Sequence, residues 1–115
     1  MATNSQIAFN PQGKTVVVAA AAAAPTGVQV PVANGQPAAG QYRVVNSGTS
    51  TVFLGVGATA ATAQANAVAP VAGTPSEAIV LVPGAVEILR FGAETFFSGL
   101  SSVAATVYIT PGQGL

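Results

Sequence analysis

Gln-Tyr-Arg-Val-Val-Asn-Ser-Gly-Thr-Ser-Thr-Val-Phe-Leu-Gly-Val-Gly, residues 41–57, is the stretch that decides the fold class of this chain. It holds two runs rich in β-branched and aromatic residues, Tyr42–Val45 and Thr51–Val56, which fit the pleated surface of a strand. The polar residues between them, Asn46–Ser50, are typical of a turn. The pattern predicts a β-hairpin closed by a five-residue loop.

The second run is apolar on both of its faces. Val52, Leu54 and Val56 alternate on one side, and Phe53 stands on the other. A strand that is apolar on both faces lies inside a sandwich or under a partner. Phe53 is therefore a candidate for contact with a partner.

Similar short strands are expected throughout the chain. The Ala-rich segment Ala58–Ala69 is the one expected helix, with Thr59 as its N-cap and Pro70 as its stop, although a loop is the alternative. A tight turn is expected at Pro83-Gly84 and a polar loop at Ser98–Ser102, with a tail after Thr110. The other expected strands are Thr15–Ala24, Val28–Val32, Ala78–Val82, Val86–Phe91, Thr95–Phe97 and Ala105–Thr110. Together they predict an all-β antiparallel sandwich, jelly-roll-like, of about seven or eight short strands and at most one short helix.

The 115 residues are expected to form an N-terminal arm, residues 1–13, followed by one sandwich domain, residues 14–115. Ile7 and Phe9 are an alternating apolar pair within the otherwise polar arm. An extended arm presents both on one face. Two interpretations stay open: an edge strand pinned to its own sandwich, or an arm that docks on a partner.

Composition favours association. Hydrophobic residues make up 50% of the chain and charged residues only 5%, the net charge is zero and the mean hydropathy is +0.59. An ordinary soluble domain carries about 25% charged residues. Low charge and abundant apolar surface predict that other subunits cover part of this surface, so a homo-oligomer is expected. A monomer with a Ser-, Thr-, Gln- and Asn-rich surface is the alternative.

The residue types that are missing narrow the function. The chain has neither Cys nor His, which argues against thiol chemistry, zinc sites and His-based catalysis. Three basic residues are too few to hold nucleic acid. The longest apolar run, Val16–Ala24, is short of the roughly 20 residues that span a bilayer, and no export signal is expected. The prediction is a protein made in the cytoplasm that needs no cofactor, metal, nucleic acid or membrane.

Two patterns invite an enzymatic interpretation and fail in context. Gly55–Ala60 fits G-x-G-x-x-A, with Glu77 twenty residues beyond Gly57, but no alternation of strands and helices follows. The only carboxylates are Glu77, Glu87 and Glu94, and they are scattered. We therefore expect no catalytic residues. The glycines are better explained by a strand end that needs small residues.

Phe96-Phe97 is the other aromatic feature of interest. Neighbouring residues of a strand point to opposite faces, so one ring is expected inside and one outside. An outward Phe on a nearly uncharged surface is a candidate interface anchor. Both residues are therefore kept as partner-interface candidates, beside Ile7, Phe9 and Phe53.

Seven segments spread over nearly the whole chain support one further expectation: Ser5–Pro11, Thr15–Ala20, Tyr42–Gly48, Val52–Gly57, Leu81–Gly84, Phe96–Gly99 and Val107–Gly112. In style and order they resemble small virion proteins of tailed bacteriophages, of the capsid cement or decoration type. The resemblance implies a β-sandwich subunit on the outer surface of the capsid, bound to the major capsid protein and self-associating, more often as a trimer than as a dimer. A head-fibre base, a tail component and a carbohydrate-binding or enzymatic sandwich remain as alternatives.

Overall fold

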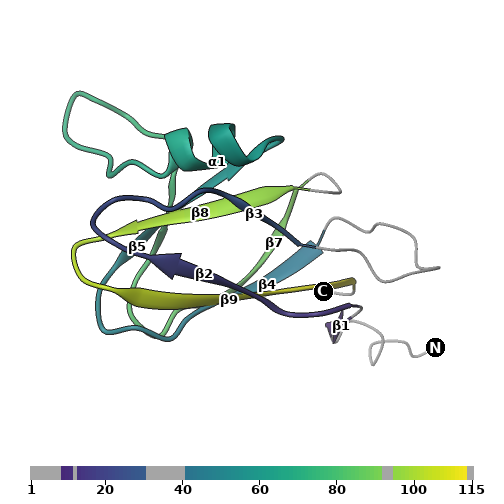
Figure 1. Cartoon of the computed structure of the whole chain (residues 1–115). Coiled ribbons are helices and arrows are strands. Elements are labelled where there is room, and N and C mark those ends of the chain that lie inside the picture. The colour runs from purple at the N-terminus through teal and green to yellow at the C-terminus, as the bar shows by residue number, and fades with distance from the viewer. Residues whose placement is uncertain (1–8, 12, 31–40, 92–94, 114–115) are drawn as a thin grey trace.

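Two layers of strands with one helix on the outside make up the computed structural model, which describes residues 9–11, 13–30, 41–91 and 95–113 (Figure 1). The helix, α1, spans Ala60–Asn66. All pairings between the strands are antiparallel, so the prediction of an all-β antiparallel sandwich with one short helix is confirmed. The strands are β1 (Asn10–Pro11), β2 (Val16–Ala20), β3 (Val28–Gln29), β4 (Gln41–Asn46), β5 (Val52–Gly57), β6 (Ile79–Leu81), β7 (Val86–Arg90), β8 (Phe96–Ser101) and β9 (Ala105–Gln113).

The strands divide between two sheets. The first, here called the β9 sheet, has the order β1-β9-β4-β7, with β2 also paired to β9. The second, called the β8 sheet, has the order β3-β8-β5-β6. The two sheets lie face to face in Figure 1, and the helix covers the outside of the β8 sheet. Among the described residues, no helix is long and apolar enough to cross a membrane, since α1 has only 7 residues.

The predicted hairpin at residues 41–57 is wrong. β4 and β5 form where expected, but β4 pairs with β9 and β7, whereas β5 pairs with β8 and β6. The polar segment between them therefore crosses from one sheet to the other. The turn at Pro83-Gly84 likewise joins β6 to β7 in the opposite sheet. A strand shows the same alternation of buried and exposed residues whether the next strand lies beside it in the same sheet or in the opposite sheet. Alternation therefore cannot distinguish a hairpin from a crossing.

Asn46 holds these two crossings together. Its side chain is fully buried, and its Nδ2 donates to the carbonyl oxygens of Ser50 (3.0 Å), Leu81 (2.9 Å) and Val82 (3.2 Å). Its Oδ1 accepts a hydrogen bond from the backbone N of Gly48 at 3.0 Å. One amide group thus bonds to backbone groups of both crossing segments, and the carbonyl oxygen of Val82 also accepts a hydrogen bond from the backbone N of Ala85.

The strand pairs are nested. β2 pairs with β9, β3 with β8, β4 with β7, and β5 with β6. The chain therefore runs as a two-stranded antiparallel ribbon, in which the segment from β2 to β5 pairs with the segment from β6 to β9. The ribbon reverses at the connection between β5 and β6, which contains α1. Successive segments of the ribbon alternate between the two sheets.

The core lies between the sheets and is mostly aliphatic. Three aromatic rings fill one part of it: Tyr42 and Phe97 meet edge to face at 5.2 Å between centroids, and Phe91 lies 5.7 Å from Phe97. Edge-to-face contacts of this kind stabilise a core beyond the area that they bury. The largest fully buried apolar side chains are Tyr42, Phe97, Leu54, Leu81, Ile109, Val18, Val30, Val44, Val52 and Val107.

Two loop predictions near the C-terminus are also wrong. The expected loop at Ser98–Ser102 is largely strand β8, and the expected tail begins inside β9. Small and polar residues occur in β8 because the space is tight. Ser98 donates its hydroxyl to the carbonyl oxygen of Pro25 at 2.6 Å, and a Cβ on Gly99 would lie 3.1 Å from that of Ala20. Composition alone assigns such residues to a loop.

The expected helix forms with Thr59 as its N-cap, but it is shorter than Ala58–Ala69: it ends at Asn66 with Ala67 as its C-cap, before the expected stop at Pro70. The Oγ1 of Thr59 accepts a hydrogen bond from the backbone N of Thr62 at 3.1 Å, which satisfies a donor of the first turn. The helix packs on β5, where a Cβ on Gly55 would collide with the carbonyl oxygen of Ala63 and come within 2.5 Å of the backbone N of Ala67. The G-x-G-x-x-A pattern therefore serves close packing of the helix on the strand.

Candidate interaction surface

A row of apolar side chains crosses the outer face of the β9 sheet. β-strands point every second side chain outward, and the register places four of these side chains beside one another on β2, β9, β4 and β7. The cross-strand partners are Val17 with Tyr108, Tyr108 with Val45, and Val45 with Val86. Half of the surface of Val17 and of Val86 is exposed, and 42% of that of Tyr108. These four residues are called the apolar row.

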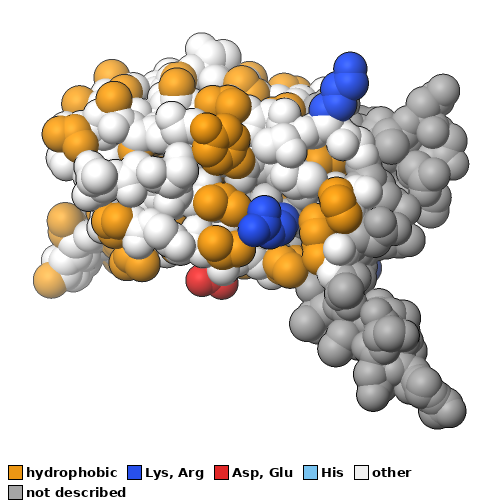
Figure 2. Space-filling model, turned by 90° about the horizontal axis from the view of Figure 1, so that it is seen from below, with side chains coloured by type: hydrophobic (Ala, Val, Ile, Leu, Met, Phe, Trp, Pro, Cys, Tyr) orange, Lys and Arg blue, Asp and Glu red, His pale blue; other side chains and the backbone are white. Residues whose placement is uncertain are grey.

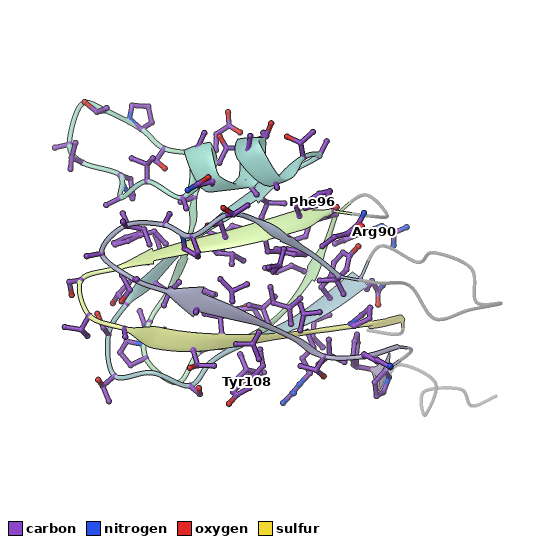
Figure 3. All side chains as sticks on the ribbon, in the orientation of Figure 1. Arg90, Phe96 and Tyr108 are labelled. Atoms are coloured by element: carbon purple, nitrogen blue, oxygen red, sulfur yellow. The ribbon has the colours of Figure 1, made fainter. Side chains whose placement is uncertain are left out.

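The positions next to the apolar row are more polar. Arg43 lies across from Thr110 on one side and Ile88 on the other, and Gln41 lies across from Arg90. Figure 2, which looks onto this face from below, shows hydrophobic side chains around well-separated Lys or Arg atoms, with an acidic side chain at the margin. In Figure 3, Tyr108 projects from the face away from the core.

A depression of about 390 Å³ lies on the same face, lined by Phe9, Pro11, Thr15, Arg43 and Thr110. It is called the Arg43 depression. Residues Asn10–Pro11 pair with Gln113 and Gly112 of β9, so the backbone of this part of the expected arm belongs to the molecule's own sheet. The interpretation of an edge strand thus applies to β1, while residues 1–8 lie outside the described part of the chain.

Arg43 is an exposed cation without a partner in the described part of the chain. None of the residues at 9–11, 13–30, 41–91 or 95–113 makes an ion pair or a hydrogen bond with its guanidinium. The hydroxyl groups of Thr15 and Thr110 are hydrogen-bonded to each other at 2.7 Å on the wall of the depression. The site therefore offers a planar set of N–H donors next to hydroxyl groups.

The opposite face of the molecule carries a shorter apolar row. Phe53 of β5 pairs with Val80 of β6 and with Leu100 of β8, and all three point away from the core. Val80 is half exposed, whereas Phe53 and Leu100 are partly buried. This group is called the Phe53 row. Because it lies on the β8 sheet, the molecule has apolar surfaces on both sides of the sandwich.

The partner-interface candidates from the sequence are distributed over several places. Phe53 and Phe9 lie on the surfaces just described. Phe96 is partly buried on the outer side of β8, below α1 in Figure 3, opposite Gly57. Phe97 is fully buried and is removed from the candidates, because its ring belongs to the aromatic core. The predicted split of this pair into one inner and one outer ring is confirmed, and Ile7 lies outside the described residues.

The apolar row itself was not found from the sequence. Alternation in Ala105–Thr110 already places Tyr108 outward, whereas Val17 lies within the apolar run Val16–Ala24, where no alternation shows which side chains face outward. What the sequence lacks is the strand order that brings these residues together, because they come from strands far apart in the chain.

The titratable residues that the structure describes do not cluster with one another. Among the described residues, no group of three or more His, Cys, Asp and Glu side chains is close enough to hold a metal ion. Glu77 and Glu87 are exposed on separate segments, and Glu94 lies outside the described part. The surfaces above are therefore the features on which a functional argument rests.

No protein-family model, curated protein or solved structure matches this chain.

Proposed function

We propose that this chain is a capsid cement or decoration subunit of a tailed bacteriophage, bound to the major capsid protein on the outside of the head. The observation that carries the proposal is the apolar row, which spans four adjacent strands of one face. Contiguous exposed apolar surface of this kind marks a site of protein interaction. Tyr108 at its centre is of the residue type that is enriched in the cores of interfaces.

The strand order supports a viral structural role. We propose that the sandwich is a jelly roll, in which an antiparallel ribbon of eight strands is wrapped into two four-stranded sheets. The nested pairs of β2 to β9 fit that description, with β2-β9-β4-β7 facing β3-β8-β5-β6. Jelly rolls are common in viral capsid proteins and also occur in lectins. The fold alone therefore does not distinguish a capsid protein from a lectin, and the choice between them depends on the surfaces of the molecule.

A cement role suits a surface with little charge. Docking through apolar side chains and backbone groups requires few ion pairs, and only 5% of the residues are charged. A bound subunit stabilises only the assembled shell, so each contact shifts the equilibrium towards the intact particle. Repeated over a capsid, contacts of ordinary size add up to a large effect on the temperature at which the shell opens.

The test uses particles stripped of this protein and reloaded with variants. We expect the triple variant Val17→Thr, Tyr108→Thr and Val86→Thr to bind the particles at least about 100-fold more weakly, because three apolar contacts of roughly 1 kcal/mol each are lost. Threonine keeps the β propensity of these positions. Co-sedimentation gives the affinity, and release of DNA on heating gives the stability of the shell.

The matched control replaces three equally exposed valines that lie outside the apolar row: Val68, Val71 and Val103. This control should bind and protect as the unmodified protein does. If particles with and without the protein release DNA at the same temperature, the cement role is contradicted. A head-fibre base or a tail component would then be the better-supported function. Counting copies per particle then separates these: hundreds support cement, and tens support the alternatives.

A homo-oligomer is part of the proposal, with a trimer favoured over a dimer. The Phe53 row supports it, since this second apolar surface stays available when the β9 sheet faces the capsid. We expect light scattering to show an oligomer at micromolar concentration, and the variant Phe53→Thr with Leu100→Thr to be a monomer. A monomeric unmodified protein, or an unchanged oligomer in the variant, would contradict the assignment.

A further inference from the structure

We propose that the Arg43 depression binds a carboxylate side chain carried by an extended segment of a partner protein, which continues along the apolar row. The identity of that partner rests on the proposed function, whereas the chemistry of the site follows from the residues that line it. The depression and the row are adjacent, because Thr110 and Tyr108 point outward two residues apart on β9.

The lining has hydrogen-bond donors to spare. A guanidinium carries five N–H donors in a flat fork that matches the two oxygens of a carboxylate, and none of those of Arg43 is used by a described residue. In the hydroxyl pair of Thr15 and Thr110, one O–H donates to the other oxygen, so one proton remains for a ligand. A ligand that only accepts hydrogen bonds satisfies both groups.

The apolar walls of the depression and the charge of this face also favour a carboxylate ligand. Phe9 and Pro11 close one side of the depression with apolar surface, which lowers the local dielectric and strengthens an ion pair. The outward positions of β2, β4, β7 and β9 hold Arg43 and Arg90 and no carboxylate, although the whole chain is neutral. The face is therefore positive relative to the rest of the molecule and complements an acidic partner.

The spacing selects an extended peptide. Alternate side chains of a strand are about 7 Å apart, so a peptide that lies along β9 with its carboxylate in the depression places its next outward residue near Tyr108. An apolar residue two positions from the acid then contacts the apolar row. A nucleic acid phosphate is disfavoured, because a phosphate backbone requires several cations in line and this face has two arginines.

The probe is the peptide acetyl-Val-Thr-Glu-Thr-Val-amide, and its matched control replaces Glu with Gln. We expect the acidic peptide to bind the isolated protein at least about 10-fold more tightly than the control in NMR titrations, a typical difference for a charged against a neutral hydrogen-bond partner. Arg43→Gln should abolish that difference, and Arg90→Gln, on the same face but outside the depression, should keep it. Both positions are exposed, so circular dichroism should show both variants folded.

Equal affinity for the two peptides, or an undiminished preference in Arg43→Gln, would overturn the proposal. Inorganic phosphate that displaces the acidic peptide more effectively than acetate would reassign the depression to phosphate. These titrations need no capsid, so their failure leaves the docking of the apolar row to its own test. A failure of the particle experiments would likewise leave the carboxylate site standing.

Discussion

Asn46→Ala is expected to lower the free energy of unfolding by about 3 kcal/mol or more. The substitution removes the hydrogen bonds that the two N–H groups of Nδ2 share among three carbonyl oxygens, and one accepted hydrogen bond, at a fully buried position. Each buried backbone group left without a partner costs roughly 1–3 kcal/mol, and water reaches only part of this site. Asn46→Asp should be at least as harmful, because a carboxylate cannot donate to the carbonyl oxygens of Ser50, Leu81 and Val82.

Chemical denaturation measures this effect, and Asn66→Ala is the matched control. With the residues that the structure describes, the side chain of Asn66 makes one hydrogen bond, from Nδ2 to the carbonyl oxygen of Val56 at 2.8 Å. Its loss should cost only about 1 kcal/mol. If both alanine variants are equally stable, Asn46 does not join the two crossings in the way described.

The same residue links stability to the docking surface. Asn46 follows Val45 directly, and its backbone N donates to the carbonyl oxygen of Ala85, the residue before Val86. Val45 and Val86 are neighbouring members of the apolar row. A disordered crossing would therefore misplace one end of the row, so Asn46→Ala should weaken particle binding beyond what the unfolded fraction explains.

Most strand positions were predictable from the sequence, except for much of β8 and the end of β9, whereas strand partners were not. The content of β-branched and aromatic residues predicts β4 and β5, and alternation predicts β9; both signals come from residues that are neighbours in the chain. The choice between a hairpin and a crossing depends on contacts such as that of Asn46 with Leu81, which are 35 residues apart in the chain. In a turn sequence, an Asn indicates a bend, and nothing local distinguishes an Asn that ends a hairpin from one that is buried between sheets.

The candidate surface was predictable to a similar extent. The sequence sets Phe53 on the face opposite Val52 and Leu54, where it predicts burial in the sandwich or under a partner, and low charge predicts apolar surface that other subunits cover. Val17, Tyr108 and Val86 form a row only after three strand pairings are known. The sequence does not distinguish Arg43 from an ordinary solvated Arg on a strand. Its distinguishing feature is the depression that it lines together with Phe9 and Pro11, which follows from the pairing of β1 with β9.

Gly55→Ala is expected to destabilise the fold by about 3 kcal/mol, a large effect for one added methyl group. The new Cβ would collide with the carbonyl oxygen of Ala63 and the backbone N of Ala67, and a helix backbone yields less readily than a side chain. Overpacking of this kind typically costs 1–3 kcal/mol. The helix must move off β5, so hydrogen exchange should show lost protection at the amide of Ala63, which is bonded to the Thr59 carbonyl.

Gly73→Ala is the control for the change of residue type. Gly73 has a φ of +81°, and nothing lies within 4 Å of the position that its Cβ would take. An alanine there is strained only through its backbone, at about 1 kcal/mol, and should leave exchange in α1 unchanged. If Gly55→Ala and Gly73→Ala lose the same stability, and α1 stays protected from hydrogen exchange in Gly55→Ala, the helix tolerates the extra methyl group. The glycines of the G-x-G-x-x-A pattern would then need a reason other than the close approach of helix and strand.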